Sequence, residues 1–191
     1  MSDLKPLEKV LPSHLDNIEK MLFKDGEMRR PLIIDEKYNV VLDGSHRYAF
    51  LVKYGFKYAP VISVQYDDES IFVGNHLKHR FLKDENFVIS KSEVIYRGLN
   101  EKLFDARTTR HFFPFRKIDH SVLLRDLVQG SEKDISYLLQ NISIEEEILK
   151  DMNYISEIDD ELAVLSSYIQ EQEDVKKYLS YQIEEMKNSC N

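Results

Sequence analysis

The feature that most constrains this chain is a five-residue polar turn, Asp43 to Arg47, set between two apolar segments. The run Val40 to Leu42 before it has the composition of a strand, and residues 46–54 have that of a helix. A strand therefore leads through a turn into a helix, which places Ser45, His46 and Arg47 at the helix N-terminus. Unpaired N–H groups and a partial positive charge make such an end a good phosphate site.

Two interpretations of this turn are open. In the first, Asp43 or Ser45 serves only as the helix cap, with the neighbouring residues on the surface. Capping accounts for an Asp and a Ser, but it does not account for Gly44, His46 and Arg47 beside them. Histidine and arginine are suited to phosphate oxygens. We therefore favour phosphate binding by Gly44, Ser45, His46 and Arg47.

Composition restricts the class of protein. With 191 residues, 42% hydrophobic and 31% charged, the chain has room for one globular domain and an appendage. It contains no apolar run near the ~20 residues that span a bilayer, no signal-like N-terminal segment and no Cys/His spacing typical of zinc. The single cysteine, Cys190, excludes an intrachain disulfide. These features predict a cytoplasmic protein.

Charge divides the chain in two. Residues 1–118 carry 20 basic and 17 acidic side chains, a net charge of +3, whereas residues 119–191 carry 6 and 17, a net charge of −11. The mildly basic front part suits an anionic small ligand. The acidic back part argues against DNA binding by that region.

The front part alternates short strands and helices. We expect helices over 15–22, with Ser13 as the cap and an end at Gly26, over 46–54, and over 92–99 after Ser90 or Ser92; we expect strands over 31–35, 38–42 and 60–66. This pattern predicts a small α/β (α+β) domain over residues 1–118.

The back part reads as an acidic helical region, residues 119–191. Segment 121–129 has helical spacing and ends at Gly130. Residues 144–186 lack glycine and proline and carry apolar residues in steps of three and four, with a break at Gln172. This segment is either one long helix, such as a coiled coil, or a helical hairpin. A helical layer on its own domain and a surface for a homodimer or a protein partner are equally open.

The turn also resembles a family signature. Asp43-Gly44-Ser45-His46-Arg47 is similar to the Asp-Gly-x-His-Arg motif of the ParB/sulfiredoxin superfamily, and within it most closely to the free L-serine kinases. Three further features match: Glu8 on the N-terminal segment, Arg30-Pro31 before a strand, and Thr108-Thr109-Arg110-His111 downstream. The resemblance covers roughly residues 4–118 and implies the small mixed-sheet fold of that superfamily.

Single residues separate the sister functions. Sulfiredoxins need a reactive cysteine in the phosphate turn, where this chain has Ser45. ParB partition proteins carry a helix-turn-helix domain after the nucleotide motif, and the acidic residues 119–191 contain no basic recognition helix. Both chemistries are therefore disfavoured.

The resemblance assigns roles to the remaining residues. Glu8 is implied to be the general base, although from sequence alone it could equally be a surface glutamate. Asp43, with His46 and Arg47, is implied to be catalytic; it would orient these two side chains or contact the metal, while its simpler role is an Asx turn. Thr108, Thr109, Arg110 and His111 are implied to bind the amino acid, against the alternative of an edge strand with a satisfied histidine.

A second polar stretch adds His76 to the substrate candidates. The serine kinases tend to have a tryptophan near this place, where the present chain has Gly74 or Asn75, so the acceptor is left open. His14 and His120 are interpreted as ordinary surface histidines.

These features predict a kinase that transfers a phosphoryl group from ATP or ADP to the hydroxyl of free L-serine, or a close relative, giving O-phosphoserine. Mg²⁺ would be held mainly by the nucleotide phosphates, with no dedicated protein ligands. The alternative is a ParB-like, nucleotide-dependent switch that acts on a partner through its C-terminal helix.

Overall fold

A computed structural model describes residues 1–74, 89–115 and 120–143, together with residues 163, 166, 170, 173–177 and 180. Its elements, in chain order, are α1 (Pro12–Asp25), β1 (Glu27–Met28), β2 (Leu32–Asp35), β3 (Val41–Asp43), α2 (Ser45–Lys53), β4 (Val61–Val64), β5 (Phe72–Gly74), α4 (Lys91–Leu99), β6 (Arg110–Phe112), β7 (Val122–Leu123) and the 3-10 turns η1 (Leu124–Leu127) and η2 (Ser136–Leu138). The mixed α/β class expected from the sequence is confirmed.

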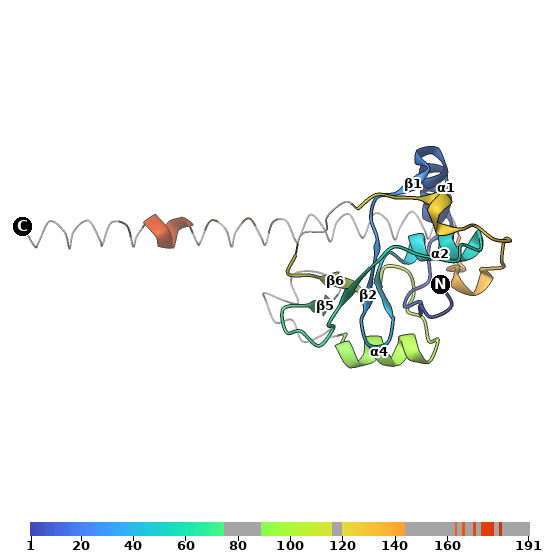
Figure 1. Cartoon of the computed structure of the whole chain (residues 1–191). Helices are drawn as coiled ribbons and strands as arrows, with labels where there is room; N and C mark the ends of the chain where they lie inside the picture. The colour runs from blue at the N-terminus through green and yellow to red at the C-terminus, as the bar shows by residue number, and fades with distance from the viewer. Residues whose placement is uncertain are drawn as a thin grey trace, which may run out of the picture.

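A three-stranded sheet in the order β3-β2-β4 forms the centre. Strand β2 pairs antiparallel with β3 and parallel with β4. Because side chains alternate along a strand, Leu32 and Ile34 pack into a core with α1 and α2, while Ile33 packs into a second core with Val94 of α4. The sheet therefore lies between α1 and α2 on one face and α4 on the other (Figure 1).

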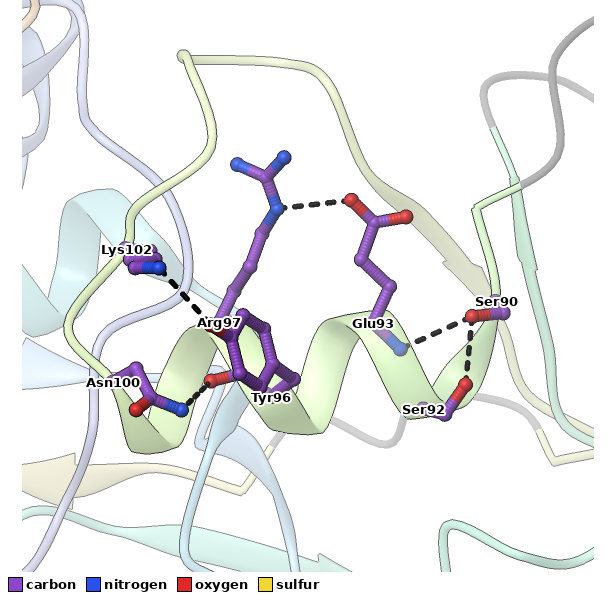
Figure 2. A network of polar contacts seen from close by, with 7 residues as sticks. All are labelled: Ser90, Ser92, Glu93, Tyr96, Arg97, Asn100 and Lys102. Carbon is purple, nitrogen blue, oxygen red and sulfur yellow. Dashed lines mark hydrogen bonds and ion pairs between the residues drawn. The ribbon is translucent and has the colours of Figure 1, made fainter.

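Helix α4 is fixed at both ends (Figure 2). The Ser90 hydroxyl accepts the Glu93 N–H at 3.1 Å, which confirms Ser90 as the cap. Lys102 Nζ donates to the Tyr96 hydroxyl at 3.0 Å beyond the other end. Gly98 allows close packing on the sheet, since a Cβ there would lie 2.6 Å from a methyl carbon of Val40.

Two of the local expectations are wrong. Helix α1 begins with Pro12 and has no side-chain cap, so Ser13 does not cap it; proline at this position lacks the N–H that a cap would satisfy. Its end at Gly26, in the left-handed conformation, is confirmed. The helix expected over 121–129 is instead β7 followed by η1. Pairing of β7 with β1 overrides the local helical spacing there.

Residues after 118 contribute to the first of these cores. Leu124, Leu127, Ile135 and Leu138 are buried in it together with α1 and α2. The division of the chain at residue 118 stays a prediction. The described residues between 163 and 180 are helical and exposed. Most of segment 144–186 lies outside the described residues, so the coiled coil and the homodimer also stay predictions. Among the described helices, none has the length and apolar content to span a bilayer.

Candidate active site

The turn after β3 opens into a pocket of about 470 Å³. The pocket is lined by Glu8, His14, Ile18, Leu42, Asp43, Gly44, Ser45, His46, Arg47, Arg107, Thr109, Arg110 and His111. Residues from the N-terminal segment, the β3–α2 turn and the start of β6 thus line one pocket. Thr108 contributes a backbone hydrogen bond to Glu8. His76 lies outside the described residues.

The N-terminus of α2 has no side-chain cap. Its cap position is Gly44, with φ 100° in the left-handed region, so neither Asp43 nor Ser45 caps the helix. The N–H groups of its first turn therefore face the pocket end of the helix without a capping oxygen, which suits an anion. Glycine is required here, because a Cβ would lie 2.8 Å from Cδ2 of Leu32 and 2.9 Å from Nη2 of Arg47.

The guanidinium of Arg47 is bound within the protein. Nη1 donates to the carbonyl oxygens of Arg30 and of Pro31, the latter at 2.7 Å, and Nη2 donates to Asp43 Oδ2 at 3.2 Å. Burial lowers the pKa of Arg47, against the opposing effect of Asp43. These contacts tie the phosphate-type turn to the residues that open β2, so Arg47 holds the shape of the turn.

Glu8 lies against the start of β6. The Thr109 hydroxyl donates to Glu8 Oε1 at 2.7 Å, and the Thr109 backbone N–H donates to the same oxygen. A bridge between Glu8 and Phe104 keeps this part of the N-terminal segment in place. Burial raises the pKa of Glu8 to about 7, and the nearby charge of Asp43 acts in the same direction. A carboxylate of this kind can take up a proton near neutral pH.

His111, in the middle of β6, is nine-tenths buried and lines the pocket. Its Nε2 lies 2.8 Å from the hydroxyl of Tyr66, and its ring stacks with Phe113 at 6.1 Å between centroids. Arg110, beside it, places its guanidinium over the Phe112 ring at 5.3 Å. Residues 110–112 form a strand, and Thr109, Arg110 and His111 also line the pocket.

Two polar pocket residues, His14 and Arg107, are not among the site residues predicted from the sequence. His14, which was interpreted as an ordinary surface residue, lines the pocket, and its Nε2 lies 2.9 Å from Nη2 of Arg107. Its ring lies 5.7 Å from the ring of His46. Arg107 has φ 63°, an unusual value for a residue other than glycine. Arg107 and Arg110 place two guanidinium groups among the pocket residues, and we call this part of the lining the cationic wall.

His46 is oriented by the backbone of the N-terminal segment. The N–H of Leu11, just before α1, donates to His46 Nε2 at 3.2 Å. The start of α1 and the start of α2 are therefore joined at the pocket. Within the described part of the chain, no group of three His, Cys, Asp or Glu side chains could hold a metal ion.

No protein-family model matches the chain. Over 70 residues it is 36% identical to a ParB-like protein from Sulfolobus acidocaldarius, covering 37% of this chain and 35% of that protein. Over 73 residues it is 32% identical to an ATP-dependent L-serine kinase from Staphylothermus marinus, covering 36% of this chain and 29% of that protein. The matches thus span about a third of each relative's length.

The fold has solved counterparts. A free serine kinase in complex with AMP superposes with a TM-score of 0.57 at 16% identity, covering 66% of this chain and 91% of that chain. The resemblance to ParB-like proteins and free serine kinases seen in the sequence is confirmed, and the fold is the one that the free serine kinase has.

Proposed function

We propose that this protein is a nucleotide-dependent kinase of a free amino acid, with L-serine or a close relative as the acceptor. The observation that supports this most directly is the position of Glu8. Its carboxyl group has a pKa raised to about 7, and it shares a pocket with the uncapped N-terminus of α2. A base and a phosphate cradle in one pocket are what phosphoryl transfer to an alcohol requires.

The donor phosphates are assigned to the β3–α2 side of the pocket. Backbone N–H groups of Ser45, His46 and Arg47 supply donors and the positive end of the helix dipole. The cationic wall, with Arg107 in contact with His14, offsets the charge that develops on the transferred phosphoryl group. Arg47 acts by holding the turn through its contacts with Pro31 and Asp43.

The acceptor is assigned to the β6 side. The serine hydroxyl oxygen forms a bond to the terminal phosphorus of the nucleotide, the bridging P–O bond breaks, and the shortened nucleotide leaves. The hydroxyl proton passes to Glu8, whose pKa near 7 suits a base at neutral pH. Thr109 and His111 would hold the amino acid, with Arg110 facing its carboxylate. The product is O-phosphoserine.

Mg²⁺ fits this pocket only as a companion of the nucleotide. The carboxylates of Glu8 and Asp43 interact electrostatically, but Asp43 already accepts a bond from Arg47. Two carboxylates with such partners do not form an oxygen cage of their own, whereas Mg²⁺ is commonly held by nucleotide phosphates and one or two carboxylates. Asp43 is the residue that would contact it, and the ion would supply charge neutralisation on the phosphates.

A second candidate function has one supporting observation, the match to a ParB-like protein. In this alternative the domain binds or hydrolyses nucleotide and so controls a partner, and the C-terminal segment is the effector. Such a switch needs Gly44 to Arg47 but has no use for Glu8, Thr109 or His111. Glu8→Gln therefore separates the two, since only a kinase loses turnover while it keeps nucleotide binding.

The decisive experiment is ³¹P NMR of the purified chain with Mg²⁺ and either ATP or ADP, with and without L-serine. We expect a new phosphomonoester resonance that appears only with serine, and the nucleotide that supports it is the donor. The switch would be supported instead if nucleotide is consumed at the same rate with and without serine or any other amino alcohol, and if no phosphorylated small molecule is formed.

A further inference from the structure

Tyr66 lies behind the acceptor side of the pocket and is not part of the pocket lining. It follows β4 by two residues and is 3% exposed, and its hydroxyl oxygen is 2.8 Å from Nε2 of His111. The two rings lie 5.5 Å apart. His111 is thus held by Tyr66 through Nε2 and also lines the pocket, while its Nδ1 is buried.

The chemistry of this pair has a preferred direction. A buried phenol that does not donate its hydrogen loses the free energy of a hydrogen bond. Burial, with a smaller effect of the Asp35 charge, raises the pKa of Tyr66 far above its ordinary value, so the hydroxyl keeps its hydrogen. A bare Nε2 on His111 gives that hydrogen an acceptor at 2.8 Å.

We propose that Tyr66 is a positioning residue, which donates to His111 Nε2 and so fixes the orientation and the tautomer of this imidazole for recognition of the amino-acid substrate. The tautomer that accepts at Nε2 carries its hydrogen on Nδ1. Nδ1 and its hydrogen are buried within the protein, so Tyr66 acts on the pocket by holding the ring of His111 in one orientation. This inference rests on the proposed function for its kinetic consequence, but not for the tautomer itself.

The first test is kinetic. Tyr66→Phe keeps the ring and removes only the hydroxyl. We expect KM for the amino acid to rise about fivefold, the ratio expected for one neutral hydrogen bond, with KM for the nucleotide unchanged. Tyr54→Phe is the matched control, because it removes a partly buried hydroxyl that donates to Glu19 at 2.9 Å, at the C-terminal end of α2. The KM values of this variant for the amino acid and for the nucleotide should both equal those of the unmodified protein.

A double-mutant cycle asks whether Tyr66 acts through the imidazole. In a His111→Ala background, Tyr66→Phe should change KM for the amino acid by less than twofold. An undiminished fivefold effect in that background would overturn the proposal, and so would an unchanged KM in Tyr66→Phe alone.

The second test needs no turnover. ¹⁵N NMR of the imidazole side chains distinguishes a bare ring nitrogen from one that carries a hydrogen. We expect His111 to show a bare Nε2 in the full chain, and a mixture of both tautomers in Tyr66→Phe. A hydrogen on Nε2 in the unmodified protein would overturn the proposal even if the protein is a kinase. If Nε2 is bare but the protein does not phosphorylate serine, the proposed kinase function is wrong and the inferred hydrogen bond from Tyr66 to His111 is still supported.

Discussion

Replacing Glu8 by glutamine should make the protein more stable at neutral pH while it removes catalysis. Glutamine is close in size and keeps an oxygen that can accept both bonds from Thr109. It has no charge to bury. The stability gain should therefore depend on pH in a way that can be calculated from the pKa of Glu8.

The sign and the size follow from proton linkage. The folded pKa is about 7, against an ordinary value of 4.5. The folded state thus holds the Glu8 proton between these pH values while the unfolded state releases it, so the contribution of Glu8 to stability is full below about pH 4.5 and is lost as pH rises through 7. At about 1.36 kcal/mol per pH unit, the loss between pH 5 and pH 8 is about 2–3 kcal/mol.

The assay is urea denaturation of both proteins at pH 5, 6, 7 and 8. The difference in unfolding free energy, Glu8→Gln minus the unmodified chain, should grow by about 2–3 kcal/mol across this range. Other titrating groups are common to both proteins and cancel. Glu27→Gln is the control, because Glu27 is exposed and its hydrogen bonds to Ser121 and Arg29 lower its pKa; its difference should stay flat above pH 5.

A flat difference for Glu8→Gln would refute the reasoning, since Glu8 would then ionise as it does in water.

The pH dependence of catalysis tests the same carboxyl group. kcat/KM of the unmodified protein should rise with pH through an apparent pKa near 7, because only the deprotonated carboxylate is a base. Glu8→Gln should lower turnover about 10²–10⁴-fold with nucleotide affinity retained in calorimetry.

Three further substitutions probe the site and its frame. Gly44→Ala should lower stability by about 1–3 kcal/mol and weaken nucleotide binding, because its Cβ would meet Leu32 at 2.8 Å; unchanged melting and binding would contradict this account of the turn. Arg107→Gln should weaken nucleotide binding about tenfold without unfolding the protein, since its contact with His14 lies on the pocket wall; calorimetry would show it. Ser90→Ala should lower stability by about 1 kcal/mol and leave turnover unchanged, which thermal melting and the kinase assay would check together.

The parts of the fold that could be predicted from sequence are those decided locally. The strand, turn and helix over residues 40–54 have strong apolar spacing and a glycine, and the structure has all three. Residues 121–129 carry equally good helical spacing, but Val122 pairs with Met28 almost a hundred residues away. No local pattern reports such a pairing.

The site divides in the same way. The phosphate-type turn could be read from five adjacent residues. Glu8 could be selected only through the family resemblance. Thr109 donates two hydrogen bonds to its carboxylate, and the residues next to Glu8 in the sequence do not predict this contact. His14 was missed because a histidine in the first turn of a helix looks like a surface residue until α1 is placed against His46.

The N-terminal caps of two short helices differ in a way that lowers the stability of one of them. Helices α2 and α4 have nine residues each, yet α4 has a serine cap whereas α2 has Gly44 at its cap position and no capping side chain. Glycine in place of a capping side chain costs a few tenths of a kcal/mol, and the charge of Glu8 costs about 2–3 kcal/mol above pH 7. Both departures from ordinary structure adjoin the same pocket. A neutral residue such as glutamine would fit at position 8 and stabilise the fold, yet the chain has glutamate there. A ligand that needs the open N–H groups and the basic carboxylate explains this choice. The pocket is therefore better explained as a phosphoryl-transfer site than as a turn that serves only the fold.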